Sequence, residues 1–392
     1  SWRFRFLPII YSHFYKFNRK LLKEYLELNS MKSKSELIKF EEGISLESGD
    51  NLSSFELMIE TYGDLNDSKT NAVLVCHAFS GNHHVAGKNP KGEIGWWDEI
   101  VGPNKAIDTN KYFVVCCNNL GGCSGSSGPS SINPTTGKIY GKDFPIVSVK
   151  DWVNSQNMLT ERLGIPRWLF VVGGSLGGMQ ALEWSIAYPE KILKAGIFAA
   201  AAKSSTQNIA MNEVGRESIR KDPNFNNGDY IELGVKPKNG LKTARMLGHI
   251  TYLSEENMDL RFGRKFQDSD SKVDGKVDFE VENYLQYKGE KFTENFDANS
   301  YILMTKAMDG YDASKNFKNL DEALSSVSSE LLIVGFDSDW LYPPERGKEI
   351  QLAAMNNNIK SSYITLDGRQ GHDSFLFASE KYEEIIQDFV GS

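Results

Sequence analysis

The sequence has few cysteines, no long apolar run and no excess of positive charge. Only four cysteines occur among 392 residues: Cys76, Cys116, Cys117 and Cys123. No apolar stretch approaches the about 20 residues that a membrane-spanning helix needs. Acidic residues outnumber basic ones, 52 to 44, and the net charge is −8, which gives little support for binding nucleic acid. These features favour a cytoplasmic protein with reduced thiols and a small-molecule substrate over a disulfide framework or a membrane protein.

The first 30 residues differ in composition from the rest of the chain. They are basic and aromatic, whereas a more ordinary mixture begins at Met31. We expect residues 1–35 to be an N-terminal extension that is flexible or foreign to the native chain.

Short apolar runs alternate with stretches of helical periodicity, and this pattern predicts an α/β fold with a mostly parallel central sheet. The residues 40–66 are expected to form an opening antiparallel hairpin. Helices are expected at residues 149–165 and 177–192. Buried strands are expected at residues 71–79, 111–120, 168–175, 194–202, 330–338 and 361–367.

The short apolar runs that predict strands do not recur between residues 203 and 325. This stretch consists of polar segments with helical spacing. The prediction is therefore a core made of residues 36–202 and 326–392. A helical lid and dimerisation insertion, residues 203–325, interrupts this core. Within the insertion, the charged segment around residues 267–282 is expected to be a solvated loop.

Four glycines surround Ser175 in VVGGSLGGMQALEWS, residues 171–185. A serine on a sharp strand-to-helix turn needs small neighbours, because helix and strand nearly touch there. Gly173 and Gly177 occupy these positions in a Gly-x-Ser-x-Gly motif, with an expected strand before it and an expected helix after it. The pattern predicts that Ser175 is a nucleophile, although a structural glycine-rich turn is the alternative.

A nucleophilic serine needs a base and an acid that orients the base, in the order serine, acid, histidine along this type of chain. Asp339 is the expected acid because its spacing to Pro343 is typical of this fold, and Asp337 is the alternative. His372 is the expected base because it alone of six histidines follows the acid at a strand end. The backbone N–H groups of Phe79 and Leu176 are the expected oxyanion donors.

Three histidines, His77, His83 and His84, lie close together in the sequence. Their grouping suggests a metal site, but no acidic or thiol residues complete a ligand set. We therefore expect no metal.

Six motifs in fixed order resemble the homoserine O-acyltransferases, a family with the α/β-hydrolase fold. They are NLGGCSGSSGPSSINP (119–134), GKDFP (141–145), GGSLGGMQALEW (173–184), ARMLGHITY (244–252), SDWLYPP (338–344) and GHDSF (371–375). The resemblance extends from about residue 38 to the carboxyl end. It implies a triad of Ser175, Asp339 and His372, a helical lid, a homodimer formed through that lid, and no cofactor besides an acyl-CoA co-substrate.

The resemblance also implies that Arg245 and Asp373 hold L-homoserine and that Tyr252 lines the same pocket. A zwitterion needs one cation and one anion near the acylated serine, and these two residues supply that pair. Taken without the family, Arg245 fits a helix-surface ion pair equally well, and Asp373 a simple turn residue.

The acyl group is expected to be acetyl. Similar proteins that use succinyl-CoA carry an arginine two positions after the acid, where this chain has Leu341, and an apolar residue offers no counter-charge to a second carboxylate. The alternative is succinyl-CoA, because the glycine-rich segment 116–129 is closer to succinyl-using members and Arg346 could replace the missing arginine.

The expected function is thus homoserine O-acetyltransferase, acting by a ping-pong mechanism in methionine biosynthesis. Three alternatives remain at this point: an esterase with the same triad, a transferase acting on serine or a similar amino alcohol, and a binding protein without catalysis.

Overall fold

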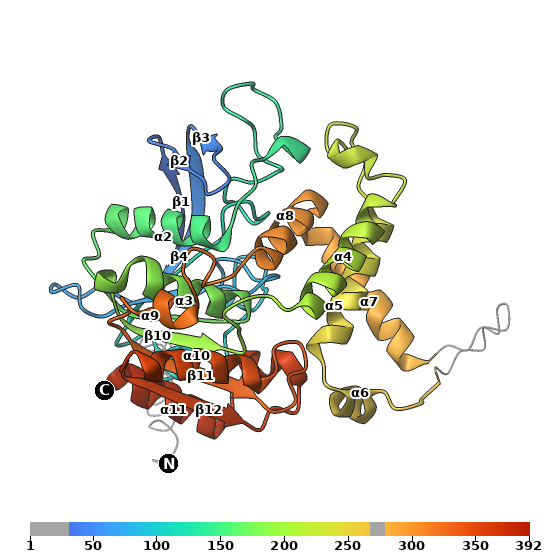
Figure 1. Ribbon diagram of the computed structural model, residues 1–392. Helices are drawn as coiled ribbons and strands as arrows, with labels where there is room; N and C mark the ends of the chain where they lie inside the picture. Colours follow the sequence, from blue (N-terminus) through green and yellow to red (C-terminus); the bar gives the residue numbers. More distant parts are fainter. Residues whose placement is uncertain (1–30, 267–278) are drawn as a thin grey trace, which may run out of the picture.

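The computed structural model describes residues 31–266 and 279–392 (Figure 1). Residues 1–30, expected to be an extension, lie outside the described residues, as does most of the predicted charged loop. An eight-stranded sheet runs through the centre of the described part, and its strand order is β1-β4-β8-β5-β9-β10-β11-β12. The strands are β1 (Ser33–Phe40), β4 (Phe55–Tyr62), β8 (Phe113–Cys117), β5 (Ala72–Cys76), β9 (Trp168–Gly174), β10 (Ile192–Phe198), β11 (Glu330–Phe336) and β12 (Ser361–Leu366).

The sheet is parallel from β8 to β12, whereas β4 pairs with β8, and β1 with β4, in antiparallel fashion. The α/β-hydrolase fold class is therefore confirmed. Residues 33–35, expected in the N-terminal extension, pair with β4. Four short strands form two separate ladders: β2 (Ile44–Ser45) with β3 (Asn51–Leu52), and β6 (Val101–Gly102) with β7 (Ile107–Asp108).

Helices cover both faces of the sheet, so the central strands are buried on both sides. Neighbouring residues of one strand therefore enter different cores. Val171 packs with α2 (Val149–Leu163), α3 (Leu176–Ala187) and α10 (Pro344–Asn356), whereas Phe170 packs with α11 (Glu380–Gly391). This two-sided burial explains why the strands are continuous apolar runs in the sequence.

The helix predicted at residues 177–192 is shorter in the structure. α3 ends at Ala187, a 3₁₀ turn covers Pro189–Lys191, and β10 begins at Ile192. Pro189 lacks a backbone N–H and cannot continue the helix. The other expected strands and the helix at 149–165 appear with ends shifted by a few residues.

Residues between β10 and β11 form a group of helices beside the sheet, on the right in Figure 1. α5 packs against α4 and α7, and α4 packs against α8. These helices, and a short one that leads back to the core, are α4 (Thr206–Arg220), α5 (Lys238–Tyr252), α6 (Glu255–Arg261), α7 (Glu280–Asn295), α8 (Ala298–Asp309) and α9 (Leu320–Leu324).

The two ends of this insertion meet. The Ala313 N–H donates to the Ala202 carbonyl over 2.8 Å, and Lys203 pairs with Asp312 in an antiparallel bridge. The insertion therefore leaves and rejoins the core at one place, close to the end of β10.

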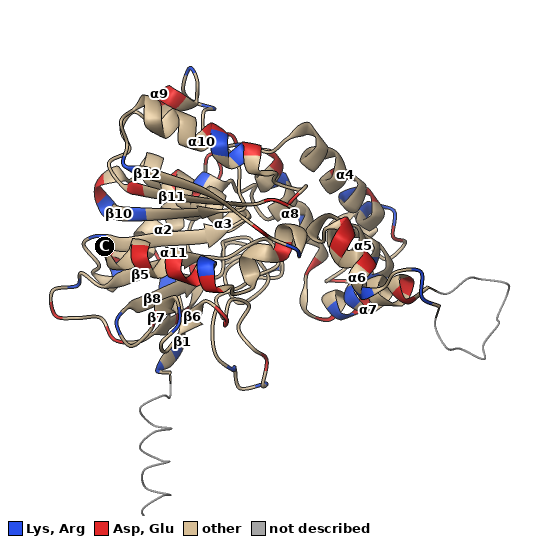
Figure 2. Ribbon diagram, turned by 90° about the horizontal axis from the view of Figure 1, so that it is seen from below, with Lys and Arg blue, Asp and Glu red and all other residues tan. Residues whose placement is uncertain are grey.

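Charged residues of both signs are interspersed over the core and insertion helices (Figure 2). Within the described ranges, no helix has the length and apolarity needed to cross a bilayer.

Candidate active site

Ser175 lies at the sharp turn between β9 and α3. Its backbone has φ 57° and ψ −123°, a conformation that costs energy for a residue with a side chain. The Ser175 N–H donates to the Phe198 carbonyl of β10 over 2.9 Å, which holds the turn. The side chain is therefore placed at the amino end of a buried helix, above the carboxyl edge of the sheet.

The glycines around Ser175 are required by close backbone contacts. A Cβ on Gly173 would lie 2.5 Å from the Cys76 carbonyl oxygen, and a Cβ on Gly177 would overlap the same carbonyl group. A Cβ on Gly178 would lie 2.6 Å from the Cβ of Ala200. The helix can approach β5 and β10 this closely only because these side chains are missing.

The structure places Asp339 against His372. Asp339 Oδ2 lies 2.8 Å from His372 Nδ1, and both residues are buried. Asp339 Oδ1 accepts hydrogen bonds from the backbone N–H groups of Leu341, at 3.0 Å, and Tyr342, at 2.9 Å. The alternative acid, Asp337, instead accepts a hydrogen bond from the Gly368 N–H over 2.9 Å.

The environment of His372 favours its protonated form. Burial lowers the pKa of the imidazole, but the charge and hydrogen bond of Asp339 and the charge of Asp373 outweigh burial, and the net pKa is raised. Such an imidazole can accept a proton and stabilise the charge that it gains.

Ser175 and His372 line one cavity of about 120 Å³, together with Phe79, Arg245, Tyr252 and Asp373. We call it the Arg245 chamber. The structure shows no hydrogen bond between the Ser175 hydroxyl and the His372 ring, as is frequent in sites without substrate. Leu176 is the first residue of α3, so its N–H has no acceptor within the helix and is available beside Ser175.

A second cavity touches Ser175 from the insertion side. We call it the Leu341 chamber, and its lining includes Asn208, Asn212, Tyr301, Thr305 and Leu341. Phe79, Ser175 and Tyr252 border both chambers. The serine therefore lies where two separate binding spaces meet.

Arg245 in α5 carries the positive charge of its chamber. Its Nε and Nη1 atoms are buried and have no hydrogen-bond partner among the described residues. The guanidinium carbon lies 4.5 Å from the Phe292 ring centroid and 5.4 Å from that of Tyr252, so aromatic faces hold it in place. Buried donors without acceptors indicate that this residue can bind an anionic group.

Asp373 lies next to His372 and faces the same chamber. Burial raises the pKa of its carboxyl group to about 6, although the charges of His372, Arg245 and Lys288 act in the opposite direction. A cationic ligand group in the chamber would favour the ionised form of this carboxylate.

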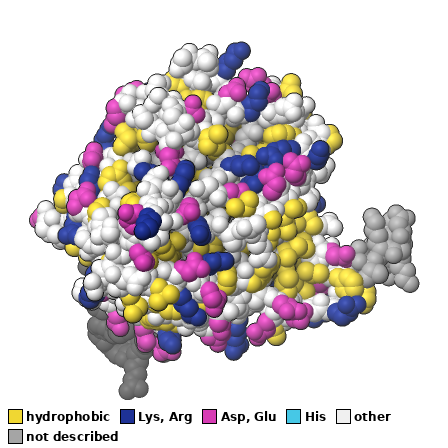
Figure 3. Space-filling model, viewed as in Figure 1, with side chains coloured by type: hydrophobic (Ala, Val, Ile, Leu, Met, Phe, Trp, Pro, Cys, Tyr) yellow, Lys and Arg dark blue, Asp and Glu magenta, His cyan; other side chains and the backbone are white. Residues whose placement is uncertain are grey.

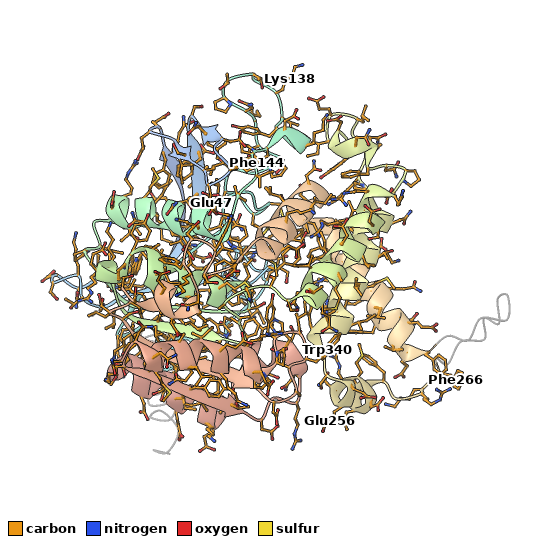
Figure 4. The ribbon with its side chains drawn as sticks, viewed as in Figure 1. Glu47, Lys138, Phe144, Glu256, Phe266 and Trp340 are labelled. Carbon is orange, nitrogen blue, oxygen red and sulfur yellow. The ribbon has the colours of Figure 1, made fainter. Side chains whose placement is uncertain are left out.

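Several site residues escaped the sequence analysis. Asn208 and Asn212 come from α4, Tyr301 from α8, and Tyr342 packs its ring 5.3 Å from that of His372. For Asn208, Asn212 and Tyr301 the only signal was the frequency of aromatic and amide residues in the insertion, whereas Tyr342 lies in the motif SDWLYPP. Trp340, whose Nε1–H donates to the Leu253 carbonyl over 3.1 Å, ties the Asp339 loop to the end of α5 (Figure 4).

Two of the three clustered histidines, His77 and His84, have other partners, whereas the buried Nδ1 of His83 has none among the described residues. The His77 Nε2 accepts a hydrogen bond from the Asn119 N–H at 3.0 Å, and burial lowers its pKa to about 4. His84 Nδ1 lies 2.9 Å from Glu60. Among the described residues no group of three metal-ligating side chains occurs. All four cysteines are free thiols.

Comparison with known proteins gives the class first. A family model described as the alpha/beta hydrolase fold matches residues 71–377, and the chain is an α/β hydrolase in its fold. A homoserine O-succinyltransferase of Hydrogenovibrio crunogenus (strain DSM 25203 / XCL-2) is 51% identical over 352 residues, which cover 88% of this chain and 91% of that protein. The chain belongs to the homoserine O-acyltransferase family.

Two solved structures are also similar. The homoserine O-acetyltransferase from Bacillus anthracis has a TM-score of 0.84 and 28% identity, covering 92% of this chain and 98% of that one. Esterase E22 has a TM-score of 0.83 and 30% identity, covering 92% of this chain and 100% of that one.

The expectation of acetyl-CoA as acyl donor, and with it of homoserine O-acetyltransferase, is wrong. The relatives that are 50 to 52% identical to this chain are named homoserine O-succinyltransferase. The expectation depended on one residue, Leu341. A leucine there shows only that no counter-charge comes from this position, and other residues of the same chamber can bind a carboxylate by hydrogen bonds.

Proposed function

We propose that this protein is a homoserine O-succinyltransferase that transfers the succinyl group of succinyl-CoA to the hydroxyl of L-homoserine, a step of methionine biosynthesis. The observation that carries the proposal is the identity of about one half, along nearly the whole chain, to relatives with that name. The two chambers beside Ser175 support it, because a two-substrate transfer needs two binding spaces at one nucleophile.

In the first half-reaction, Ser175 is the nucleophile and His372 the base. The Ser175 hydroxyl gives its proton to His372 while its oxygen attacks the thioester carbonyl. The N–H groups of Phe79 and Leu176 stabilise the resulting oxyanion. The intermediate collapses with cleavage of the C–S bond, and the thiolate of CoA takes the proton from His372. Succinyl-Ser175 and free CoA thiol are the products.

In the second half-reaction, homoserine enters the Arg245 chamber. Its carboxylate pairs with Arg245 and its ammonium with Asp373. The homoserine hydroxyl gives its proton to His372, and its oxygen attacks the acyl-serine carbonyl. Ser175 leaves as the alkoxide, recovers the proton from His372 and returns to its starting state, while O-succinylhomoserine departs.

The succinyl chain is assigned to the Leu341 chamber. That chamber borders Ser175 and is not lined by Arg245, and its lining offers the amides of Asn208 and Asn212. Asn212 already donates to Asp309 over 2.7 Å, which fixes the orientation of its amide. Hydrogen bonds from such groups can bind the distal carboxylate without an arginine at position 341.

Release of CoA thiol tests the proposal. Purified protein is mixed with succinyl-CoA or acetyl-CoA, with and without L-homoserine, and free thiol is followed. We expect sustained release with succinyl-CoA only when homoserine is present, and a kcat/KM for acetyl-CoA at least about tenfold lower. Equal rates with both acyl donors, or a preference for acetyl-CoA, would exclude the succinyl assignment.

An esterase is the second candidate, because esterase E22 shares the fold at 30% identity. Hydrolysis would release thiol at the same rate with and without homoserine. The buried donors of Arg245 favour the transferase, since an esterase for neutral substrates has no need of a guanidinium beside the nucleophile.

We also propose that the insertion forms a homodimer interface. Large apolar side chains are exposed on four of its helices, among them Val214 on α4, Leu260 on α6 and Tyr287 on α7. Figure 3 shows hydrophobic side chains gathered on the side where these helices lie. Light scattering of the parent and of Val214→Glu should give a dimer and a monomer respectively.

A further inference from the structure

A third cavity lies away from Ser175, between α2, the carboxyl end of α3 and the segment by which the insertion rejoins the core. It has a volume of about 300 Å³. Residues of all three segments line it, and Glu47, labelled beside α2 in Figure 4, lies at its edge. Neither the proposed reaction nor the family comparison assigns a role to this cavity.

Glu183 is the most unusual residue of its lining. It lies on α3, its side chain is more than nine-tenths buried, and it forms no hydrogen bond or ion pair with any described residue. Burial raises the pKa of its carboxyl group to about 7, with the charge of Lys150 acting in the opposite direction. A buried carboxylate without a donor is costly, so a cationic group in the cavity would stabilise its ionised form.

Tyr311 supplies a second unsatisfied group in the same wall. It is 7% exposed, it lines the cavity, and its hydroxyl has no hydrogen-bond partner among the described residues. Burial raises the pKa of this hydroxyl well above its ordinary value, and the nearby charge of Glu183 adds to the shift. A carboxylate and a buried hydroxyl without a partner, from different segments, thus lie at one cavity, and a buried hydroxyl without a partner is rare in folded proteins.

Cations lie around the same cavity. Lys150, in the first turn of α2, forms no ion pair with the described residues, and Lys315 lies 3.6 Å from Glu47 at the edge. The amino end of α2 adds the partial positive charge of a helix terminus. The lining also includes the apolar side chains of Val149, Ile186 and Phe317 and a further carboxylate, that of Asp312.

We propose that this cavity binds a small aliphatic amino acid as a zwitterion. Its ammonium pairs with Glu183 and contacts the Tyr311 hydroxyl, its carboxylate pairs with Lys150, and its side chain lies on the apolar residues. The site is distinct from the Arg245 chamber, because Glu183 follows Ser175 by eight residues on α3, a distance of about 12 Å along a helix.

Calorimetric titration of the full chain tests this site without any acyl-CoA, so that its result is independent of the proposed reaction. The probes are L-leucine, L-valine and L-methionine. Each is compared with its N-acetyl derivative, which lacks the ammonium, and its amide, which lacks the carboxylate. We expect saturable binding of at least one amino acid and binding at least tenfold weaker for both of its derivatives.

Variants locate the binding. Glu183→Gln, which keeps the shape of the side chain, and Tyr311→Phe are each expected to weaken binding, the first by at least tenfold. Arg245→Ala, in the other chamber, should leave the dissociation constant unchanged. Circular dichroism and the melting temperature of Glu183→Gln confirm that this variant is folded.

Three results would overturn the inference. They are no saturable heat with any of the three amino acids, unchanged affinity in folded Glu183→Gln, and loss of binding in Arg245→Ala, which would place the ligand beside Ser175.

Discussion

The strand ends of the core and the helices of the insertion present polar side chains to Ser175 in different ways. Asp339 Oδ2 and His372 Nδ1 lie 2.8 Å apart, and two backbone N–H groups donate to the other carboxylate oxygen of Asp339. Arg245 keeps two buried nitrogen atoms without a partner among the described residues. A complete pair suits chemistry that is the same for every acyl group, whereas free donors suit recognition of a particular substrate. In the proposed function, the Asp339–His372 pair therefore takes part in the reaction and Arg245 in substrate recognition.

The largest expected effect is that of Ser175→Ala. Both half-reactions should fall by at least about 10⁴-fold, because no acyl-enzyme can form. Stopped-flow thiol release and mass spectrometry of the acylated protein measure the loss. Ser185→Ala is the matched control, since Ser185 is a buried serine of the same helix whose hydroxyl donates to the Ala181 carbonyl. If Ser175→Ala kept its activity, Ser175 would not be the nucleophile, and the comparison of the groups around it would lose its meaning.

Asp339→Asn should lower kcat by about 10³ to 10⁴-fold with either acyl donor, because the imidazole loses the charge that orients and stabilises it. Asp337→Asn is the control, and it should stay within about threefold of the parent, because an amide oxygen can still accept from the Gly368 N–H. If Asp337→Asn lowered kcat more than Asp339→Asn in steady-state assays, Asp337 would be the acid.

Arg245→Ala tests whether this insertion residue acts on homoserine binding alone and not on acylation of Ser175. The kcat/KM for homoserine should fall by about 10² to 10³-fold, since a charged hydrogen-bonded pair is lost, while succinylation of Ser175 should change by less than about threefold. Arg261→Ala is the control, because the Arg261 guanidinium packs on the Tyr284 ring at 4.8 Å and lines neither chamber. Equal losses in both half-reactions would show that Arg245 also binds the acyl donor.

The pH dependence of acylation tests the coupling of Asp373 to His372. The Asp373 carboxylate contributes to the raised pKa of His372, and the imidazole must be neutral to take the serine proton. The rate of thiol release should therefore fall as pH drops through the pKa of His372. Asp373→Asn removes a negative charge and should shift that fall to lower pH. A shift to higher pH, or none, in pre-steady-state pH profiles without homoserine would contradict the assigned coupling.

The smallest effect is expected for Asn212→Ala. Loss of a hydrogen bond to the succinyl carboxylate should lower kcat/KM for succinyl-CoA roughly tenfold. The rate with acetyl-CoA, measured on the same protein, is the internal control and should change less than twofold. If both fall together, the Leu341 chamber does not distinguish acyl groups through this amide.

The core could be predicted from the sequence because its signals are local. Gly173 and Gly177 mark a turn where backbones touch, and apolar runs mark strands that are buried on both faces. The pairing of His372 with Asp339 followed from the fold class, because parallel strands end at the same edge. These features depend on short segments and on one sheet.

The insertion could not be predicted in the same way. Asn212 and Tyr301 reach the site only through the packing of α4, α5 and α8, and helical periodicity does not specify which helix faces contact each other. The prediction of the acyl group from Leu341 failed for a related reason, because one residue does not determine which acyl group a whole chamber binds. Glu183 had no signal at all, because a single glutamate in a helix is ordinarily exposed.

The antiparallel contact between Lys203 and Asp312 has an evolutionary consequence. Because the insertion begins and ends at neighbouring points, its replacement by another helical segment of different length leaves the strand order intact, provided that the new segment restores the hydrogen bond from Trp340 to the end of α5 that supports the Asp339 loop. A chimaera carrying the insertion of a related hydrolase should therefore fold, keep its reactive serine and acquire the substrate range of the donor. New members of such a family can thus arise by exchange of one contiguous piece.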